Sequence, residues 1–210
     1  MLFDLDGTIA DTAPDLAAAA NAMRRARGMN DLPLTILRPY ASQGARGLVG
    51  AALQKTPVDP EYEALREEFL TRYENALCVE SRLFHETELL IEALEQRGLK
   101  WGIVTNKVGR FTTPLVSLLK LVPGASTVVC GDTTPHTKPH PAPLLYAASE
   151  MQVSPLHCVY IGDDRRDIEA GRAAGMSTVA AAYGYCAETD PHDWQADGLI
   201  NSPLELLDLL

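Results

Sequence analysis

From about residue 86 onward, the chain alternates short apolar runs with stretches in which apolar residues recur every three or four positions. Short apolar runs bounded by turn residues predict buried strands, and the periodic stretches predict helices. Strands are expected at residues 1–5, 101–105, 127–130, 158–161 and 178–182. Helices are expected at residues 89–98, 110–120, 142–151 and 165–174. This alternation is typical of a parallel sheet flanked by helices, so we predict an α/β fold with a Rossmann-like core.

Residues 14–85 follow a different pattern, because their apolar period is helical throughout. The first helix of this block is expected to begin at Thr12, Pro14 and Asp15, which combine an N-cap, a first-turn proline and a carboxylate three positions after the cap. We therefore predict that a helical cap domain interrupts the α/β domain. The expected boundaries are 14–85 for the cap domain, and 1–13 with 86–210 for the core domain.

The 210 residues include 18 Lys and Arg against 28 Asp and Glu, a net charge of −10. An acidic chain offers few cations to phosphate backbones, so nucleic acid is not expected as a partner. No apolar stretch approaches the length that a membrane span requires, so no membrane partner is expected. The 4 cysteines include no CxxC pair, which favours neither a disulfide framework nor a zinc site. A cytoplasmic protein is the simplest interpretation.

Two aspartates, Asp4 and Asp6, stand at the end of the first predicted strand, followed by Gly7 and Thr8. The i, i+2 spacing places both carboxylates on one face at the carboxyl end of a strand, where open α/β sheets bind their ligands. Only residues 1–3 precede Asp4, whereas a central strand usually has about five to six residues. We therefore expect further apolar residues upstream.

Three other polar elements stand at or near later strand ends: Thr105 with Asn106, Lys138 before a proline, and the acidic run 162–167. Each has an ordinary explanation by itself, as a helix cap, a solvated charge or an acidic helix start. Together they supply what phosphoryl transfer requires. A cluster of carboxylates also needs a cation, and hard oxygen ligands favour Mg²⁺ over zinc.

This set of motifs, DxDGT, a strand-ending Thr, Lys-Pro and GDDxxxD, resembles the haloacid dehalogenase superfamily over essentially the whole chain. The segments DGTIADTAPD, VTNK, KPHPAPL and IGDDRRDIEAGRAAG look like its phosphoglycolate phosphatase-like branch. The segments SQGARGLVGAAL and YGYCAETDPHDWQAD are also similar to N-acetylmuramic acid 6-phosphate phosphatases. The resemblance implies a sheet of order 3-2-1-4-5, a small α-helical cap and Mg²⁺-dependent phosphatase chemistry.

The resemblance implies that Asp4 is the nucleophile, forming an aspartyl phosphate, and that Asp6 is the general acid and base. It also implies that Mg²⁺ contacts Asp4, the backbone carbonyl of Asp6, and Asp163. Asp164 and Asp167 either contact the metal as well or lie outside its direct ligands, for example as partners of Lys138. Both interpretations remain open at this point.

The phosphate group also needs partners. Thr105 offers a hydroxyl, Lys138 a positive charge, and the backbone amides around Gly7 and Thr8 an anion-binding turn. Thr8 and Asn106 are further candidates for substrate binding. Their alternative roles are those of a turn residue and a helix cap.

In the cap, the turn from Gln43 to Gly47 is the expected contributor to substrate binding. Gly44 would allow close backbone approach, and Arg46 would pair with a substrate carboxylate; the alternative is an exposed loop with a solvated arginine. We predict a phosphomonoesterase for a small phosphorylated carboxylate, with 2-phosphoglycolate first and N-acetylmuramic acid 6-phosphate second. The alternatives from other classes are a phosphomutase and a non-catalytic regulator that binds a phosphorylated metabolite.

Overall fold

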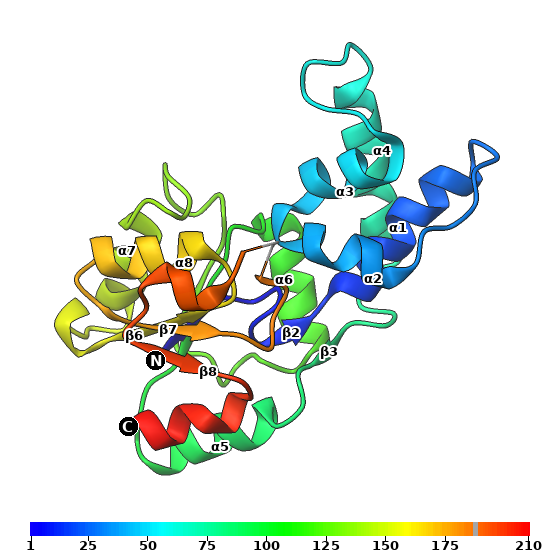
Figure 1. The fold of residues 1–210 in the computed structure, drawn as a ribbon. Helices are drawn as coiled ribbons and strands as arrows, with labels where there is room; N and C mark the ends of the chain where they lie inside the picture. The colour runs from blue at the N-terminus through cyan, green and yellow to red at the C-terminus, as the bar shows by residue number, and fades with distance from the viewer. Residues whose placement is uncertain (187–188) are drawn as a thin grey trace.

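Six parallel strands form the central sheet of the computed structural model, which describes residues 1–186 and 189–210 (Figure 1). Their order is β5-β4-β1-β6-β7-β8, so the predicted 3-2-1-4-5 arrangement is confirmed and a further strand, β8, is added at one edge. The strands are β1 (Leu2–Phe3), β4 (Gly102–Val104), β5 (Val128–Val129), β6 (Val159–Gly162), β7 (Ser177–Ala181) and β8 (Gly198–Ile200).

The strands are short, but helices bury both faces of the sheet. Successive strand residues point to opposite faces, and the core divides accordingly. In β1, Leu2 belongs to one hydrophobic cluster and Phe3 to another. The Phe3 cluster includes apolar residues of α5 (Thr87–Gln96), α6 (Gly109–Leu118) and η5 (Pro203–Leu209), and the Leu2 cluster includes those of α7 (Ala142–Glu150) and α8 (Arg165–Ala173). The layers are therefore helix, sheet and helix.

The helices around the sheet are α5 (Thr87–Gln96), α6 (Gly109–Leu118), α7 (Ala142–Glu150), η2 (Pro155–His157), α8 (Arg165–Ala173), η4 (Pro191–Trp194) and η5 (Pro203–Leu209). Gly98 and Gly175 both have positive φ just after a helix, the conformation that commonly ends one. On α5, Leu90 and Leu94 face the core, and Leu89 is 56% exposed.

Residues 13–75 form a separate helical block above the sheet (Figure 1). It consists of α1 (Ala13–Arg25), α2 (Leu34–Leu37), η1 (Arg38–Gln43), α3 (Gly44–Leu53) and α4 (Tyr62–Asn75). These helices share their own hydrophobic cluster, in which Phe111 and Tyr185 are the only fully buried members from outside the block among the described residues.

Two antiparallel strands, β2 (Ala10–Asp11) and β3 (Arg82–Leu83), carry the chain into and out of the helical block. Helix α1 begins where Thr12 and Pro14 predict it. Thr12 is its N-cap residue, but the Thr12 side chain makes no capping hydrogen bond to the helix. The Thr12 hydroxyl donates to Asp6, and Asp15 accepts hydrogen bonds from the Ser81 backbone and hydroxyl. Thr12 and Asp15, predicted to start the helix, therefore hydrogen-bond to residues of the segments that lead into and out of the helical block.

Strand β8 and helix η5 were not among the expected elements. β8 has three residues and only Ile200 is buried, so it carries little apolar signal. The structure places the four cysteines as free thiols. Across the described ranges, no helix is long and apolar enough to cross a membrane. In the segment YGYCAETDPHDWQAD, residues 187–188 lie outside the described residues.

Candidate active site

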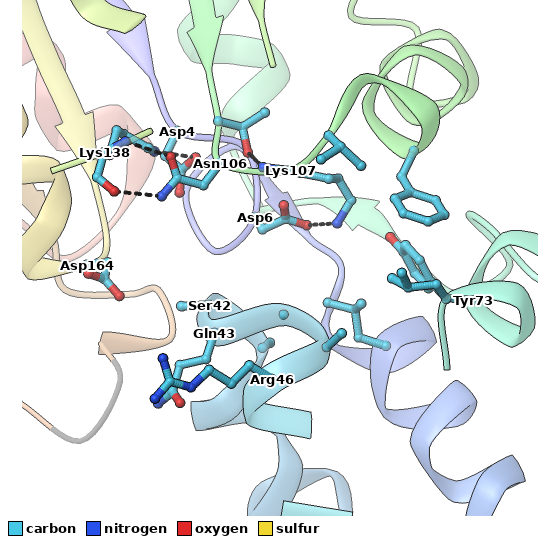
Figure 2. Close-up of a pocket in the computed structure, with 18 of the residues that line it drawn as sticks. Asp4, Asp6, Ser42, Gln43, Arg46, Tyr73, Asn106, Lys107, Lys138 and Asp164 are labelled. Atoms are coloured by element: carbon cyan, nitrogen blue, oxygen red, sulfur yellow. Dashed lines mark hydrogen bonds and ion pairs between the residues drawn. The ribbon is translucent and has the colours of Figure 1, made fainter. Parts of the chain in front are cut away.

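The site lies at the carboxyl edge of the three central strands. β1 lies between β4 and β6, so the residues that follow these strands, Asp4, Thr105 and Asp163, are brought to one edge. Lys138 joins them from the segment before α7, and its ammonium approaches Asp4 (Figure 2). The strand order thus assembles motifs that are more than 150 residues apart in sequence.

Three buried carboxylates form the acidic part of the site. Oxygens of Asp4, Asp163 and Asp167 lie within 4.8 Å of one another, and these residues are 9%, 0% and 1% exposed. Asp163 is held by the Thr8 hydroxyl, 2.9 Å from Oδ1, and by the Tyr185 backbone N–H, 2.8 Å from Oδ2. The orientation of Asp163 is therefore fixed from two sides.

Glycines make room for these carboxylates. Gly7 has φ +89°, and a Cβ there would lie 2.1 Å from Asp163 Oδ2. Gly184 is equally restricted, since a Cβ there would lie 2.2 Å from Asp163 Cβ. The glycine of the first motif is thus required both by its positive φ and by the approach of Asp163.

Lys138 is the positive charge within this cluster and is 4% exposed. Its Nζ lies 2.8 Å from Asp4 Oδ1 and 2.7 Å from Asp167 Oδ1. It also donates to the Tyr160 hydroxyl at 2.8 Å and to the Val104 carbonyl at 3.1 Å. Four oxygen atoms therefore fix the ammonium beside Asp4.

Asp164 and Asp167 have different surroundings. Asp167 contacts Lys138 and also accepts from the Asp164 N–H at the start of α8, so it both pairs with the lysine and caps the helix. Asp164 instead accepts from the Arg166 side chain through both carboxylate oxygens, at 2.8 Å each. The Arg166 guanidinium also donates to the Ser42 carbonyl, which links α8 to the helical block.

Burial perturbs the acidic cluster strongly. It raises the pKa of Asp4 to about 7, against the opposing effect of Lys138. Burial, and then the charges of Asp4 and Asp167, raise the pKa of Asp163 well above its ordinary value. One ammonium faces three buried carboxylates, so the cluster lacks positive charge.

The residues fit a divalent metal. The donors are carboxylate oxygens, which Mg²⁺ prefers. Asp4 Oδ1 is buried and accepts no hydrogen bond of ordinary geometry from the described residues. A dication in this cluster would balance the two negative charges that Lys138 leaves over.

We expect the metal-free protein to lose stability as the pH rises from about 5 to about 8. Asp4, with a raised pKa of about 7, keeps in the folded state a proton that the unfolded chain releases near its ordinary value of 3.8. This contribution is complete below the unfolded-state pKa and is lost as the pH rises through the folded-state pKa. The melting temperature without metal should fall by about 5 °C over this range, and Mg²⁺ should restore it at the alkaline end.

Asp4→Asn provides the comparison, because it removes this group and should reduce the pH dependence to the part that Asp163 contributes. Asp31→Asn, at an exposed residue paired with Arg25, should melt like the wild type at every pH. A melting temperature that rises with pH in the absence of metal would contradict this account of the cluster.

Asp6 lies apart from this cluster and has two partners of its own. Its Oδ1 accepts from the Thr12 hydroxyl and, at 2.9 Å, from Lys107 Nζ. Lys107 also lies over the ring of Tyr73 in α4, 4.9 Å from its centroid. The sequence shows that Lys107 follows Thr105 and Asn106, but nothing in the pattern separates it from a solvated lysine.

Thr105 and Asn106 line the site in different ways. The Thr105 hydroxyl accepts from the Lys107 N–H at 3.1 Å, which leaves its own proton available. The Asn106 amide is bonded twice to the Lys138 backbone, at 3.0 and 2.9 Å. Asn106 therefore positions the Lys138 segment, and its predicted contact with substrate is not what its amide does here.

The predicted anion-binding turn at Gly7 and Thr8 is wrong. The Gly7 N–H donates to the Ala10 carbonyl at 2.9 Å, and the Thr8 N–H lies 3.4 Å from the Leu5 carbonyl within the same turn. The Thr8 side chain is 1% exposed and its hydroxyl donates to Asp163. Thr8 therefore supports Asp163, because the turn folds back on the acidic cluster.

A cavity of about 340 Å³ lies between the sheet edge and the helical block. Asp4, Asp6, Thr105 and Lys138 line it from the sheet side. From the helical side, Gly44, Arg46 and Arg66 contribute, with an apolar wall that includes Tyr62, Phe69 and Leu70. The helical block brings two arginines and no acidic residue to the cavity.

Gly44 and Arg46 both line the cavity, but the predicted turn is helical there: η1 ends at Gln43, and both residues lie in the first turn of α3. Gly44 serves the backbone: it has φ +57° and joins η1 to α3, and a Cβ there would meet nothing within 4 Å. Gly47 is restricted by packing within the helical block, since a Cβ there would lie 2.8 Å from the Tyr40 carbonyl oxygen. The Arg46 side chain is exposed.

Known proteins share this arrangement. A sequence model of haloacid dehalogenase-like hydrolases matches residues 1–181. The chain belongs to the haloacid dehalogenase-like hydrolase family. It is 44% identical over 211 residues to the N-acetylmuramic acid 6-phosphate phosphatase of Pseudomonas aeruginosa, covering 100% of this chain and 93% of that one.

Two further relatives bear on this family assignment. The phosphoglycolate phosphatase of Xanthomonas campestris is 44% identical over 207 residues, covering 98% of this chain and 93% of the relative. The crystal structure of a predicted phosphoglycolate phosphatase from Haemophilus somnus matches with a TM-score of 0.87 and 26% identity, over 99% of this chain and 96% of that one. The family resemblance drawn from the motifs is therefore confirmed.

Proposed function

We propose that this protein is a Mg²⁺-dependent phosphomonoesterase that acts through an aspartyl-phosphate intermediate. The observation that carries this proposal is the placement of Asp4: the residue lines the cavity, and its Oδ1 accepts no hydrogen bond of ordinary geometry from the described residues but lies 2.8 Å from Lys138 Nζ. A carboxylate held in this way is free to attack phosphorus. The names of the curated relatives, all phosphatases, support the same reaction class.

In this mechanism Asp4 attacks the phosphorus atom and the ester oxygen leaves. Asp6 donates a proton to the leaving oxygen and then accepts one from the water that hydrolyses the aspartyl phosphate. Lys138 and Thr105 both line the cavity, and the ammonium and the hydroxyl stabilise the phosphoryl oxygens as charge develops on them. Thr12 and Lys107 hold the Asp6 carboxylate in place for both proton transfers.

Asp4, Asp163 and the backbone carbonyl of Asp6 would hold the metal, with Asp167 beside them. When bound, Mg²⁺ supplies positive charge that offsets the anionic phosphate and the carboxylates. The protein's own contribution is to keep Asp163 oriented through Thr8 and Tyr185.

We further propose that residues 14–85 act as a cap domain over a core formed by 1–13 and 86–210. The helical block has its own hydrophobic cluster, and its entry and exit run together through β2 and β3. Such a cap excludes water from the cavity and selects the substrate.

The substrate class that we propose is a small phosphorylated carboxylate, with 2-phosphoglycolate as the first candidate. N-acetylmuramic acid 6-phosphate is the second candidate. The cavity of about 340 Å³, with apolar residues and two arginines on its cap side, has room for this larger substrate. Both are substrates that the names of close relatives carry.

We expect phosphate release from both substrates to require Mg²⁺. Dialysis against EDTA should lower the rate at least about 100-fold, and added Mg²⁺ should restore it, because the acidic cluster repels a phosphate ester without a cation. Comparing kcat/KM for the two substrates identifies the preferred one. Undiminished activity in EDTA, or no phosphate release from any phosphomonoester, would contradict the proposal.

A further inference from the structure

Lys107 is buried next to the residue that handles the leaving group. Its side chain is 10% exposed, and its Nζ lies 2.9 Å from Asp6 Oδ1. The ammonium carries three N–H donors, and the contact with Asp6 uses one of them. Lys107 also borders the cavity, so it presents positive charge to whatever lies beside Asp6.

Tyr73 completes a polar patch at this place. It comes from α4 of the helical block and is 2% exposed, and its hydroxyl makes no hydrogen bond of ordinary geometry to the described residues, although Lys107 lies close enough to oppose the rise in the Tyr73 pKa that burial causes. Figure 2 shows the hydroxyl end of Tyr73 directed toward Lys107 and Asp6. A buried hydroxyl without a partner is costly unless a ligand or water satisfies it. The core thus contributes a cation and the cap a donor, both beside Asp6.

The position of Lys107 and Tyr73 beside Asp6 determines which substrate carboxylates could bind to them. In a phosphate ester with a carboxylate on the carbon next to the ester oxygen, ordinary bond lengths place a carboxylate oxygen about 3–4 Å from the ester oxygen. Asp6 must reach that ester oxygen to protonate it. The substrate carboxylate therefore lies next to the Asp6 carboxylate, and the two negative charges repel unless a cation lies within reach of both.

Arg46 lies too far along the cavity for this task. It is exposed in the first turn of α3, and Figure 2 shows it across the cavity from Asp6. Arg46 suits a carboxylate remote from the ester, as in a phosphorylated sugar acid. Lys107 is the cation that contacts Asp6.

We propose that Lys107 and Tyr73 form the binding site for a carboxylate attached to the carbon next to the ester oxygen. This inference rests on the proposed phosphatase function and narrows its substrate class to 2-phosphooxy carboxylates, of which 2-phosphoglycolate is the smallest. Lys107 pairs with the substrate carboxylate while it keeps its contact with Asp6, and the Tyr73 hydroxyl donates to the same carboxylate. Closure of the cap thereby completes the site.

The test compares 2-phosphoglycolate with ethyl phosphate, which has a methyl group in place of the carboxylate. The ratio of kcat/KM for the two esters reports carboxylate recognition separately from general loss of activity. Lys107→Met should lower this ratio about 10- to 100-fold, Tyr73→Phe should lower it about 3- to 10-fold, and Lys107→Arg should restore part of it. Tyr73→Phe keeps the ring and the Lys107–Asp6 contact, so it is informative even if Lys107→Met folds poorly.

Two surface variants serve as matched controls. Lys55→Met, at a cap lysine paired with Glu61, and Tyr146→Phe, at a 43% exposed tyrosine of α7, should leave the ratio unchanged. An unchanged ratio in both Lys107→Met and Tyr73→Phe would overturn the inference, as would a wild-type enzyme that hydrolyses the two esters equally well. A wild type that hydrolyses neither ester but releases phosphate from N-acetylmuramic acid 6-phosphate would overturn the inference and leave the proposed function standing, whereas release from no phosphomonoester would overturn both.

Discussion

Replacing Asp4 with Asn is expected to lower kcat at least about 10⁴-fold while the protein remains folded. The amide keeps the shape of the carboxylate but cannot form an aspartyl phosphate, so the covalent route is lost. The substitution also removes one of three buried carboxylates that face a single ammonium. The metal-free variant should therefore melt at or above the wild-type temperature near neutral pH.

Two measurements separate this result from simple unfolding. Brief incubation with radiolabelled substrate followed by acid quenching should trap label on the wild type and none on Asp4→Asn. Asp31→Asn, at an exposed Asp in an ion pair with Arg25, should keep full activity and normal labelling. Turnover by Asp4→Asn above a few per cent of the wild type would contradict Asp4 as the nucleophile.

The strands of the sheet could be predicted because their signals are local, whereas their order followed from the resemblance to the haloacid dehalogenase superfamily. Each buried strand is a short apolar run, and parallel strands joined by helices leave few possible arrangements. The carboxyl ends of β1, β4 and β6 then had to meet, and the structure places Asp4, Thr105 and Asp163 together. Elements that bury little apolar surface, such as β2, β3 and β8, gave no comparable signal.

Side-chain partnerships across the chain could not be predicted in this way. The Lys107–Asp6 contact joins positions 101 residues apart, and a single lysine carries no periodicity that would reveal it. In sequence Tyr73 belongs to the apolar face of α4, and it is buried there, but only the folded structure shows that the residue also lines the cavity beside Lys107. Short polar motifs located the chemistry, but not which groups position it.

The same limit explains the error at Thr8. A hydroxyl after a DxDG motif suits either a phosphate or a neighbouring carboxylate, and the motif itself does not distinguish them. The deciding factor is Gly7, whose positive φ turns the chain so that Thr8 meets Asp163. Asp163 lies 155 residues away in sequence, beyond the reach of any local pattern.

Replacing Lys138 with Met is expected to lower kcat at least about 100-fold and to destabilise the metal-free protein by about 3–5 kcal/mol. Methionine has similar length and leaves no cavity of note, so the loss is that of the charge. Asp4 and Asp167 would then face each other without their shared cation, and the Tyr160 hydroxyl would lose its contact with the ammonium. Mg²⁺ should recover much of the stability and little of the activity, since the metal balances the carboxylates but does not replace the ammonium at the phosphoryl group.

The pH profile shows whether the lysine acts on Asp4. Burial raises the pKa of Asp4 and Lys138 opposes that rise, so removing Lys138 raises it further. A nucleophile must be deprotonated, and the acid limb of kcat should therefore move to higher pH in Lys138→Met. Lys55→Met, on the surface of the cap, should keep the wild-type profile and melting temperature. The assigned role of Lys138 is to keep Asp4 ionised as a carboxylate. A rate of Lys138→Met within tenfold of the wild type, or an acid limb that moves to lower pH, would contradict this role.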